Sequence, residues 1–179
     1  MKLSGNKGEW SELYVLIKLL AEGKIYSAKE NLQKNENCWF PILKIFREEK
    51  KTSKIEYVSS NKDFVEVYFN GNFAKRIETS ELAKAAGFFY DAIVHGEGEG
   101  AFQIDSAASV MENLHCEKIR ADSNDKADIK MEIHDPFTNF ERICGFSIKS
   151  DLGNPPTLFN ASQSTNLRTC LKSFENKGK

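Results

Sequence analysis

The sequence lacks the features that mark membrane, secreted and zinc-stabilised proteins. No apolar run approaches the roughly 20 residues that span a bilayer, and no apolar segment follows the N-terminal Met-Lys, so we expect neither membrane association nor a signal peptide. The cysteines are few, lie far apart and form no Cys-x-x-Cys pair: Cys38, Cys116, Cys144 and Cys170. This spacing argues against structural zinc and favours a cytoplasmic protein with reduced thiols.

Neither sign of charge is in excess. The 25 Lys and Arg residues against 26 Asp and Glu residues give a formal net charge of -1, so charge alone does not indicate nucleic-acid binding. A nuclease remains compatible with this balance, because a basic cleft and an acidic metal site cancel. One basic stretch stands out, and we interpret it as a solvated strand end rather than a phosphate-binding patch: Lys44, Arg47, Lys50, Lys51 and Lys54.

The composition, 40% hydrophobic and 28% charged, is that of a globular protein, and the length fits one domain over residues 1–179. Periodicity predicts helices over residues 9–22, 81–94 and 103–115. Strands are predicted over 40–46, 54–58, 64–69 and 73–77, with a tight turn at Asn70-Gly71, as an antiparallel meander. The pattern also predicts strands over residues 128–133 and 142–149, which should pair as a further hairpin. We therefore expect an α/β fold with a mixed sheet flanked by helices.

Asp128 and Lys149 fall on the two strands of that last hairpin. Phosphodiester hydrolysis needs an activated water and a stabilised negative charge, and Mg²⁺, which prefers carboxylates, supplies both. Ser147 and Lys149 are two residues apart, so they share a face of a strand. The pattern predicts Asp128 as metal ligand, Lys149 as the group that positions or activates the water, and Ser147 as an assistant. The alternatives are a turn residue at 128 and an edge lysine at 149 that discourages aggregation.

Three segments add a family resemblance to this pattern. They are Gly8-Glu9-Trp10-Ser11-Glu12-Leu13-Tyr14, Gly145-Phe146-Ser147-Ile148-Lys149-Ser150 and Pro155-Pro156-Thr157-Leu158-Phe159-Asn160-Ala161-Ser162. They resemble the HpaII family of type II restriction endonucleases, within the PD-(D/E)XK nuclease superfamily. The resemblance covers both ends of the chain and is looser in its middle. It implies a restriction-endonuclease-like fold and Mg²⁺-dependent cleavage of double-stranded DNA at CCGG.

The sequence departs from the superfamily motif at two positions. Ala127 precedes Asp128 in place of proline, and Ser147 replaces the second acid, a poorer magnesium ligand than a carboxylate. Glu9 and Glu12 share a face of the first helix. The resemblance implies that a glutamate of that helix reaches the metal site, and Glu12, and after it Glu9, is the preferred substitute. Their alternative role is on a solvated helix face near the positive end of the helix dipole. Two weaker substitutes lie elsewhere, Glu132 and Gln163.

The polar segment after Lys149 is the expected DNA contact, with a plain surface loop as the alternative. Its candidate residues are Asn154, Thr157, Asn160, Ser162, Gln163 and Arg168. Cleavage of both DNA strands requires a homodimer or sequential nicking. The chain is shorter than expected for the family, which suggests the N-terminal part of a longer architecture. The rival interpretations are a catalytically inactive or truncated DNA-binding relative, and an unrelated fold with chance similarity.

Overall fold

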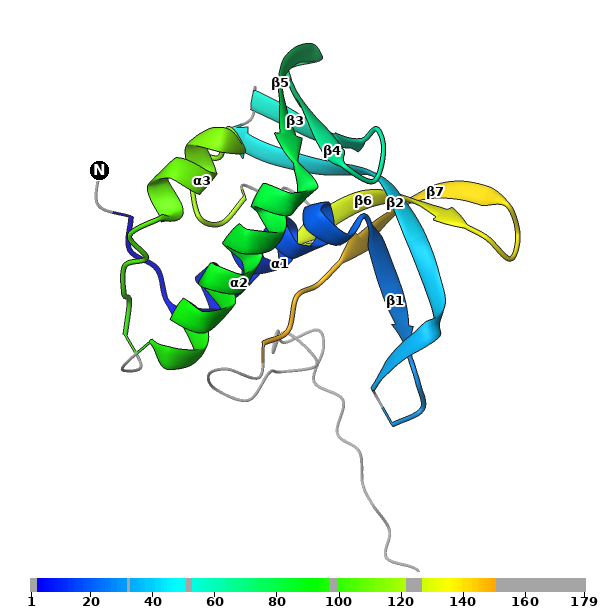
Figure 1. The fold of residues 1–179 in the computed structure, drawn as a ribbon, viewed down its shortest axis with the longest axis horizontal. Coiled ribbons are helices and arrows are strands. Elements are labelled where there is room, and N and C mark those ends of the chain that lie inside the picture. The colour runs from blue at the N-terminus through cyan, green and yellow to red at the C-terminus, as the bar shows by residue number, and fades with distance from the viewer. Residues whose placement is uncertain (1–2, 32, 51–52, 97–99, 122–126, 151–179) are drawn as a thin grey trace, which may run out of the picture.

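The computed structural model describes residues 3–31, 33–50, 53–96, 100–121 and 127–150. Its elements are α1 (Lys7–Glu22), β1 (Lys24–Ala28), β2 (Lys34–Lys50), β3 (Ser53–Ser59), β4 (Phe64–Phe69), β5 (Asn72–Glu78), α2 (Thr79–His95), α3 (Ala107–Asn113), β6 (Ile129–Asp135) and β7 (Phe140–Phe146), shown in Figure 1. The strands form a 7-stranded sheet in the order β5-β4-β3-β2-β6-β7, with β1 paired to β2. The fold is thus of the α/β class, as the sequence predicted.

Each strand pairing in the described ranges is antiparallel, so the expected mixed sheet was wrong. Short connections account for most of the pairings, because antiparallel neighbours need only a tight turn whereas parallel neighbours need a long crossover. The turn between β4 and β5 is the predicted one, with φ of 50° at Asn70 and 79° at Gly71. The helical connection from β5 places β6 antiparallel to β2, between β2 and the edge strand β7.

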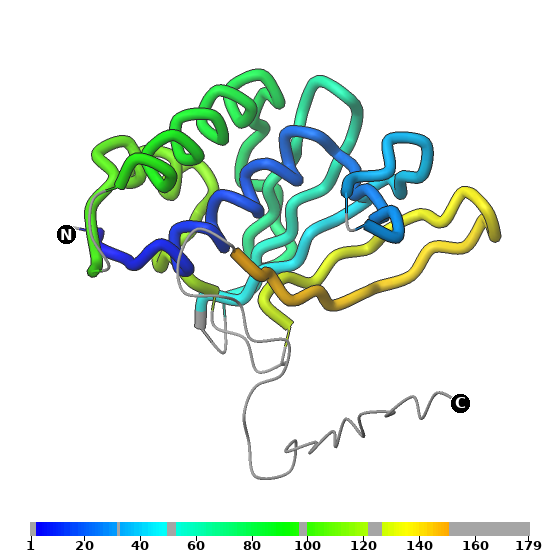
Figure 2. Tube along the Cα trace, turned by 90° about the horizontal axis from the view of Figure 1, so that it is seen from below, coloured from blue at the N-terminus to red at the C-terminus, as the bar shows by residue number. Residues whose placement is uncertain are grey.

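Helices α1 and α2 pack side by side over one face of the sheet, as Figure 2 shows. Helix α1 begins where the Asn6 side chain accepts the Glu9 backbone N–H at 2.9 Å, and it ends at Gly23 with a left-handed φ of 63°. Its Trp10 is fully buried, lies 5.9 Å from the ring of Phe89, and donates its indole N–H to the Phe102 carbonyl at 3.1 Å. The α1 position therefore depends on both α2 and the segment that follows it.

Several boundaries differ from those that the sequence predicts. Strand β2 is 17 residues long, and its first half pairs with β1, which the sequence analysis did not predict. The two extend beyond the rest of the sheet in Figure 1. Helix α3 is shorter than the expected helix over 103–115. Strand β7 stops at Phe146, so Ser147 and Lys149 follow the strand instead of lying within it. No helix in these described ranges combines the length and apolarity needed to cross a membrane.

Candidate active site

Asp128 lies immediately before β6, at the open end of the β6–β7 hairpin. Its backbone N–H donates to the carbonyl of Phe146 at 3.0 Å, which continues the pairing of the two strands by one residue. Its carboxylate Oδ2 then accepts the backbone N–H of Ile148 at 2.8 Å. A side chain has replaced a backbone carbonyl as the acceptor at that point, which explains why the regular strand ends at Phe146.

The segment after β7 continues the alternation of the strand. Phe146 and Ile148 are half-buried and pack against the core, whereas Ser147 and Lys149 are exposed. The structure therefore places Ser147 and Lys149 on one exposed face. Lys149 is the residue after Ile148, so its backbone lies next to the amide that binds Asp128. The next residue, Ser150, accepts a hydrogen bond at 3.1 Å from Ser11, which ties this segment to α1.

Glu12 of α1 lies on the other side of Asp128, and Arg120 lies between the two. The Arg120 guanidinium places its Nε 3.5 Å from Glu12 Oε1 and one terminal nitrogen 3.6 Å from Asp128 Oδ1. Both carboxylates are mostly buried, with 18% and 17% of their side chains exposed. The three residues join α1, the segment after α3 and the start of β6 into one site.

Burial raises the pKa of Glu12 above its usual value. The positive charge of Arg120 opposes that shift, and the negative charge of Asp128 adds to it. The two carboxylates share a small recess lined by Glu12, Leu16, Ile45, Phe46, Arg47, Ala121, Asp128 and Ile129. A pair of carboxylates in a partly desolvated recess is stabilised by a cation, and in this structure Arg120 has that position.

The other acids that the sequence analysis considered have different partners. The Glu9 carboxylate accepts the backbone N–H of Asn6 at 2.9 Å and completes a capping box at the start of α1. The Glu132 carboxylate lies 3.7 Å from Lys44 on β2. Gln163 and the expected DNA-contacting residues fall outside the described ranges: Asn154, Thr157, Asn160, Ser162 and Arg168.

The two carboxylates are donors of the kind that a divalent metal ion uses. In the part of the chain that the structure describes, no group of three or more His, Cys, Asp or Glu side chains could hold a metal. Mg²⁺, however, is commonly bound by one or two carboxylates together with waters and substrate phosphates. Glu12 and Asp128, bridged by one guanidinium, provide that number of carboxylates.

A buried ion pair behind the site was missed by the sequence analysis. We expected Arg47 in a solvated basic stretch, but it is only 7% exposed and its Nε lies 2.5 Å from Oε1 of Glu49. Arg47 also donates to the carbonyl of Lys118 at 2.6 Å, and Glu49 accepts the Lys118 backbone N–H at 3.1 Å. The pair thus anchors the chain two residues before Arg120. The sequence offers one indication of this pair, an Arg and a Glu two residues apart on the same face of a strand. That spacing is too common to predict a buried ion pair.

Gly145 allows the residue before Asp128 to approach β7. A Cβ atom built at Gly145 would lie 2.7 Å from the Cβ of Ala127, closer than real carbon atoms approach. The glycine in the Gly-Phe-Ser-Ile-Lys segment therefore has a steric role next to the site. A side chain there would push Ala127, and Asp128 with it, away from β7.

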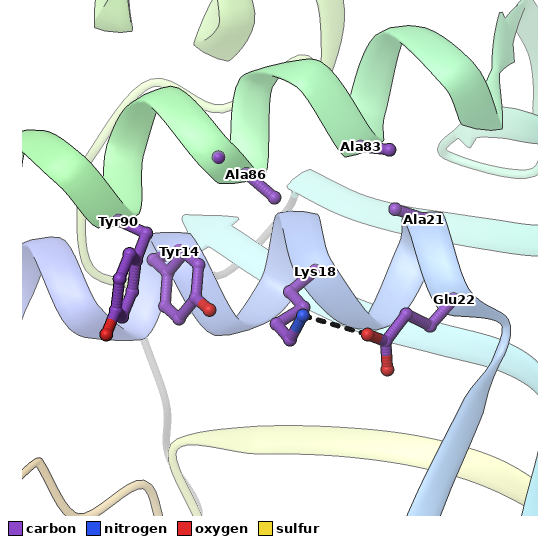
Figure 3. A pocket seen from close by; sticks show the side chains of 8 residues that line it. Tyr14, Lys18, Ala21, Glu22, Ala83, Ala86 and Tyr90 are labelled. Atoms are coloured by element: carbon purple, nitrogen blue, oxygen red, sulfur yellow. Dashed lines mark ion pairs between the residues drawn. The ribbon is translucent and has the colours of Figure 1, made fainter.

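A second hollow, between α1 and α2, has a different character (Figure 3). It is lined by Tyr14, Lys18, Ala21, Glu22, Ala83, Ala86, Gly87 and Tyr90. Its two charged side chains, Lys18 and Glu22, pair with each other at 2.8 Å. The hollow therefore offers small apolar groups and tyrosines, without the paired carboxylates of the recess at Asp128.

Comparison with known proteins gives a consistent family. The family model described as HpaII restriction endonuclease matches residues 6–178. The type II restriction enzyme HpaII of Haemophilus parainfluenzae is 36% identical over 174 residues, which are 97% of this chain and 48% of that enzyme. The chain thus spans about half the length of that relative. No solved structure matches the chain.

Proposed function

The chain belongs to the HpaII restriction endonuclease family, and from this membership we propose that it cleaves double-stranded DNA as a type II restriction endonuclease. The proposed cofactor is Mg²⁺ and the proposed target is a short CCGG-like sequence. One observation supports the proposal most: Glu12 and Asp128 share the Arg120 guanidinium, and Asp128 is hydrogen-bonded to the residue before Lys149. Two carboxylates thus share one cation at the open end of the hairpin, and Lys149 directly follows the residue whose amide Asp128 binds.

In the proposed mechanism, Asp128 is the central metal ligand and Glu12 is the acid that substitutes for the one missing at Ser147. The capping box engages Glu9 in starting α1, which makes Glu12 the better choice of the two. A bound Mg²⁺ would supply Lewis-acid activation of water and of the phosphate. Asp128 is oriented for its role by the Ile148 amide, because that hydrogen bond fixes one carboxylate oxygen.

Lys149 is the proposed residue that holds the attacking water and offsets charge on the phosphate. Its exposure leaves the ammonium group accessible to DNA, and the packing of Ile148 fixes the backbone from which it extends. Ser147 lies on the same exposed face and is proposed to hydrogen-bond the water or a phosphate oxygen. The polar segment after Ser150 is proposed to contact DNA, and a homodimer is proposed to cut both strands.

A second candidate is a DNA-binding relative without catalysis. One observation favours it: a serine at position 147, where the superfamily motif has an acid. Such a protein would bind duplex DNA and leave it intact. The two candidates therefore differ in strand breakage and agree in DNA binding.

The deciding experiment incubates the full chain with supercoiled plasmid that carries CCGG sites. We expect linear or nicked plasmid in Mg²⁺, intact plasmid in EDTA, and intact plasmid with the Asp128→Asn variant. A gel shift on a CCGG duplex is measured in parallel. A shift without any strand breakage in Mg²⁺ would contradict the nuclease proposal and support the binding relative.

A further inference from the structure

Arg120 is in the position that a metal ion bound to Glu12 and Asp128 would need. Its guanidinium lies 3.5 Å from one carboxylate and 3.6 Å from the other. A dication held by the same two oxygens would repel that positive charge at close range. The site therefore accommodates either the guanidinium or the metal between these carboxylates, and binding of one requires displacement of the other.

The guanidinium is loosely held, whereas its backbone is firmly held. The Arg120 side chain is 63% exposed, and exposed ion pairs at such distances are weak. The preceding residues, in contrast, are fixed by the buried pair: Arg47 donates to the carbonyls of Lys118 and Ile119, and Glu49 accepts the Lys118 N–H. Arg120 can thus change rotamer while its attachment point stays beside the site.

We infer that Arg120 is a resident counter-cation, which leaves Glu12 and Asp128 when the metal binds and then binds a phosphate of the DNA backbone. This inference rests on the proposed function, because it assigns the metal to those two carboxylates. A guanidinium is suited to both positions, since its planar donors bind carboxylate and phosphate alike. Arg120 would keep the two carboxylates together before metal binding and add a DNA contact afterwards.

The first test measures Mg²⁺ binding to the DNA-free full chain by calorimetry. Two ion pairs to an exposed guanidinium, each of ordinary strength, correspond to a change of roughly tenfold, so Arg120→Ala should bind Mg²⁺ about tenfold more tightly than the wild type. The Mg²⁺ affinity of Arg120→Lys should lie between those of the wild type and Arg120→Ala, because a single ammonium group cannot contact both carboxylates as the planar guanidinium does. Arg76→Ala is the matched control: Arg76 is 53% exposed and pairs with Glu66 on the meander, and its loss should leave Mg²⁺ affinity unchanged.

The second test measures affinity for a CCGG duplex at several salt concentrations, with Ca²⁺ in place of Mg²⁺. A denaturing gel checks that the duplex stays intact. Loss of one phosphate contact should reduce the slope of log affinity against log salt by about 1 in Arg120→Ala, and should not in Arg76→Ala. An Mg²⁺ affinity in Arg120→Ala that equals or falls below that of the wild type overturns the inference, as does an unchanged salt slope.

Asp128→Asn separates failure of this inference from failure of the proposed function. If the wild type binds Mg²⁺ and Asp128→Asn does not, the carboxylate site stands and the behaviour of Arg120→Ala alone decides the inference. If wild type, Arg120→Ala and Asp128→Asn all fail to bind Mg²⁺, both as the DNA-free chain and with the CCGG duplex present, the proposed metal site is wrong and the inference falls with it.

Discussion

Asp128 accepts a hydrogen bond at 2.8 Å from the backbone N–H of Ile148, across the open end of the β6–β7 hairpin. This bond ends the regular pairing of the two strands and fixes the orientation of the carboxylate. It also positions the backbone from which the next residue, Lys149, extends. The carboxylate thus has a structural contact and a proposed chemical role, and substitutions can separate the two.

Asp128→Asn should abolish cleavage and leave stability nearly unchanged. The asparagine carbonyl oxygen still accepts the Ile148 amide, whereas the negative charge that binds a metal is lost. Asp128→Ala should also abolish cleavage and in addition cost about 1 kcal/mol of stability, because the hydrogen bond is lost as well. Plasmid cleavage and urea unfolding measure the two effects. Wild-type cleavage rates in Asp128→Asn would remove this residue from the mechanism.

Lys149→Ala should lower the cleavage rate by several orders of magnitude, because the proposed water-positioning group and a charge at the phosphate are lost together. The expected change in stability is small, since the side chain is exposed. Lys84→Ala, at an exposed lysine of α2, is the control for loss of one positive charge. A decrease of less than tenfold, about 1.4 kcal/mol in the activation barrier, would count against the role of Lys149.

Glu12→Gln and Glu9→Gln test which glutamate of α1 completes the metal site. Glu12→Gln should weaken Mg²⁺ binding and cleavage by at least about tenfold, because one of two charged ligands becomes a neutral amide. Glu9→Gln should retain activity and helix stability, because glutamine can also accept the Asn6 N–H in a capping box. Equal losses in the two variants would contradict the assignment of Glu12.

Glu49→Gln should be among the most destabilising single changes at a polar residue. It leaves the buried Arg47 charge without its partner, and breaking such a pair typically costs about 3–5 kcal/mol. Glu66→Gln removes the charge that pairs with the exposed Arg76 and should cost less than about 1 kcal/mol. Urea unfolding of both variants gives the comparison. Similar small losses in the two would show that the Arg47–Glu49 pair does not stabilise the fold.

Asp135 should contribute stability that disappears in acid. Hydrogen bonds from the backbone N–H of Phe137, together with the neighbouring Thr138 and Arg142, lower the pKa of this carboxyl below its usual value. A lowered pKa in the folded state stabilises the fold above the unfolded value, near 3.9, and the contribution is lost as pH falls through the folded pKa.

Asp135→Asn is therefore expected to be less stable than the wild type at pH 7, with the difference shrinking as the pH is lowered below about 4. Unfolding midpoints measured from pH 7 to pH 2.5 give the comparison. Asp91→Asn, on the exposed face of α2, is the control. A stability difference that stays constant over the whole pH range would contradict the electrostatic explanation.

The sequence predicted the elements whose signals are local. Helix α1 was predicted from its apolar spacing and the glycine at its end, and the β4–β5 hairpin from Asn70-Gly71. Strand β1 was missed because its residues are nearly uniformly half-buried, so no alternation marks it. The end of β7 could not be predicted, because a side chain from another strand, that of Asp128, terminates it.

The candidate site was predictable only in part for the same reason. Asp128 and Lys149 were predicted as site residues from a motif on two neighbouring strands, and the family resemblance added to that prediction. Arg120 has no such motif, and its proximity to Glu12 exists only after α1 packs against the sheet. The role of Arg47 depends on a carbonyl 71 residues away, at Lys118. Contacts between residues so far apart in sequence depend on tertiary packing, and a local sequence pattern does not predict them.

The antiparallel register of the β6–β7 hairpin, from Ile129 opposite Phe146 to Asp135 opposite Phe140, determines which changes of length related proteins can tolerate. Adding or removing one residue from each strand near the tip keeps the Asp128 carboxylate at the Ile148 amide, so the reach of the hairpin can vary among homologues without a change in chemistry. A single-residue deletion within one strand shifts the cross-strand partners by one position and separates Asp128 from the Ile148 amide. Insertions and deletions in functional relatives should therefore come in matched pairs here, and the hairpin tip is the place to graft a foreign segment.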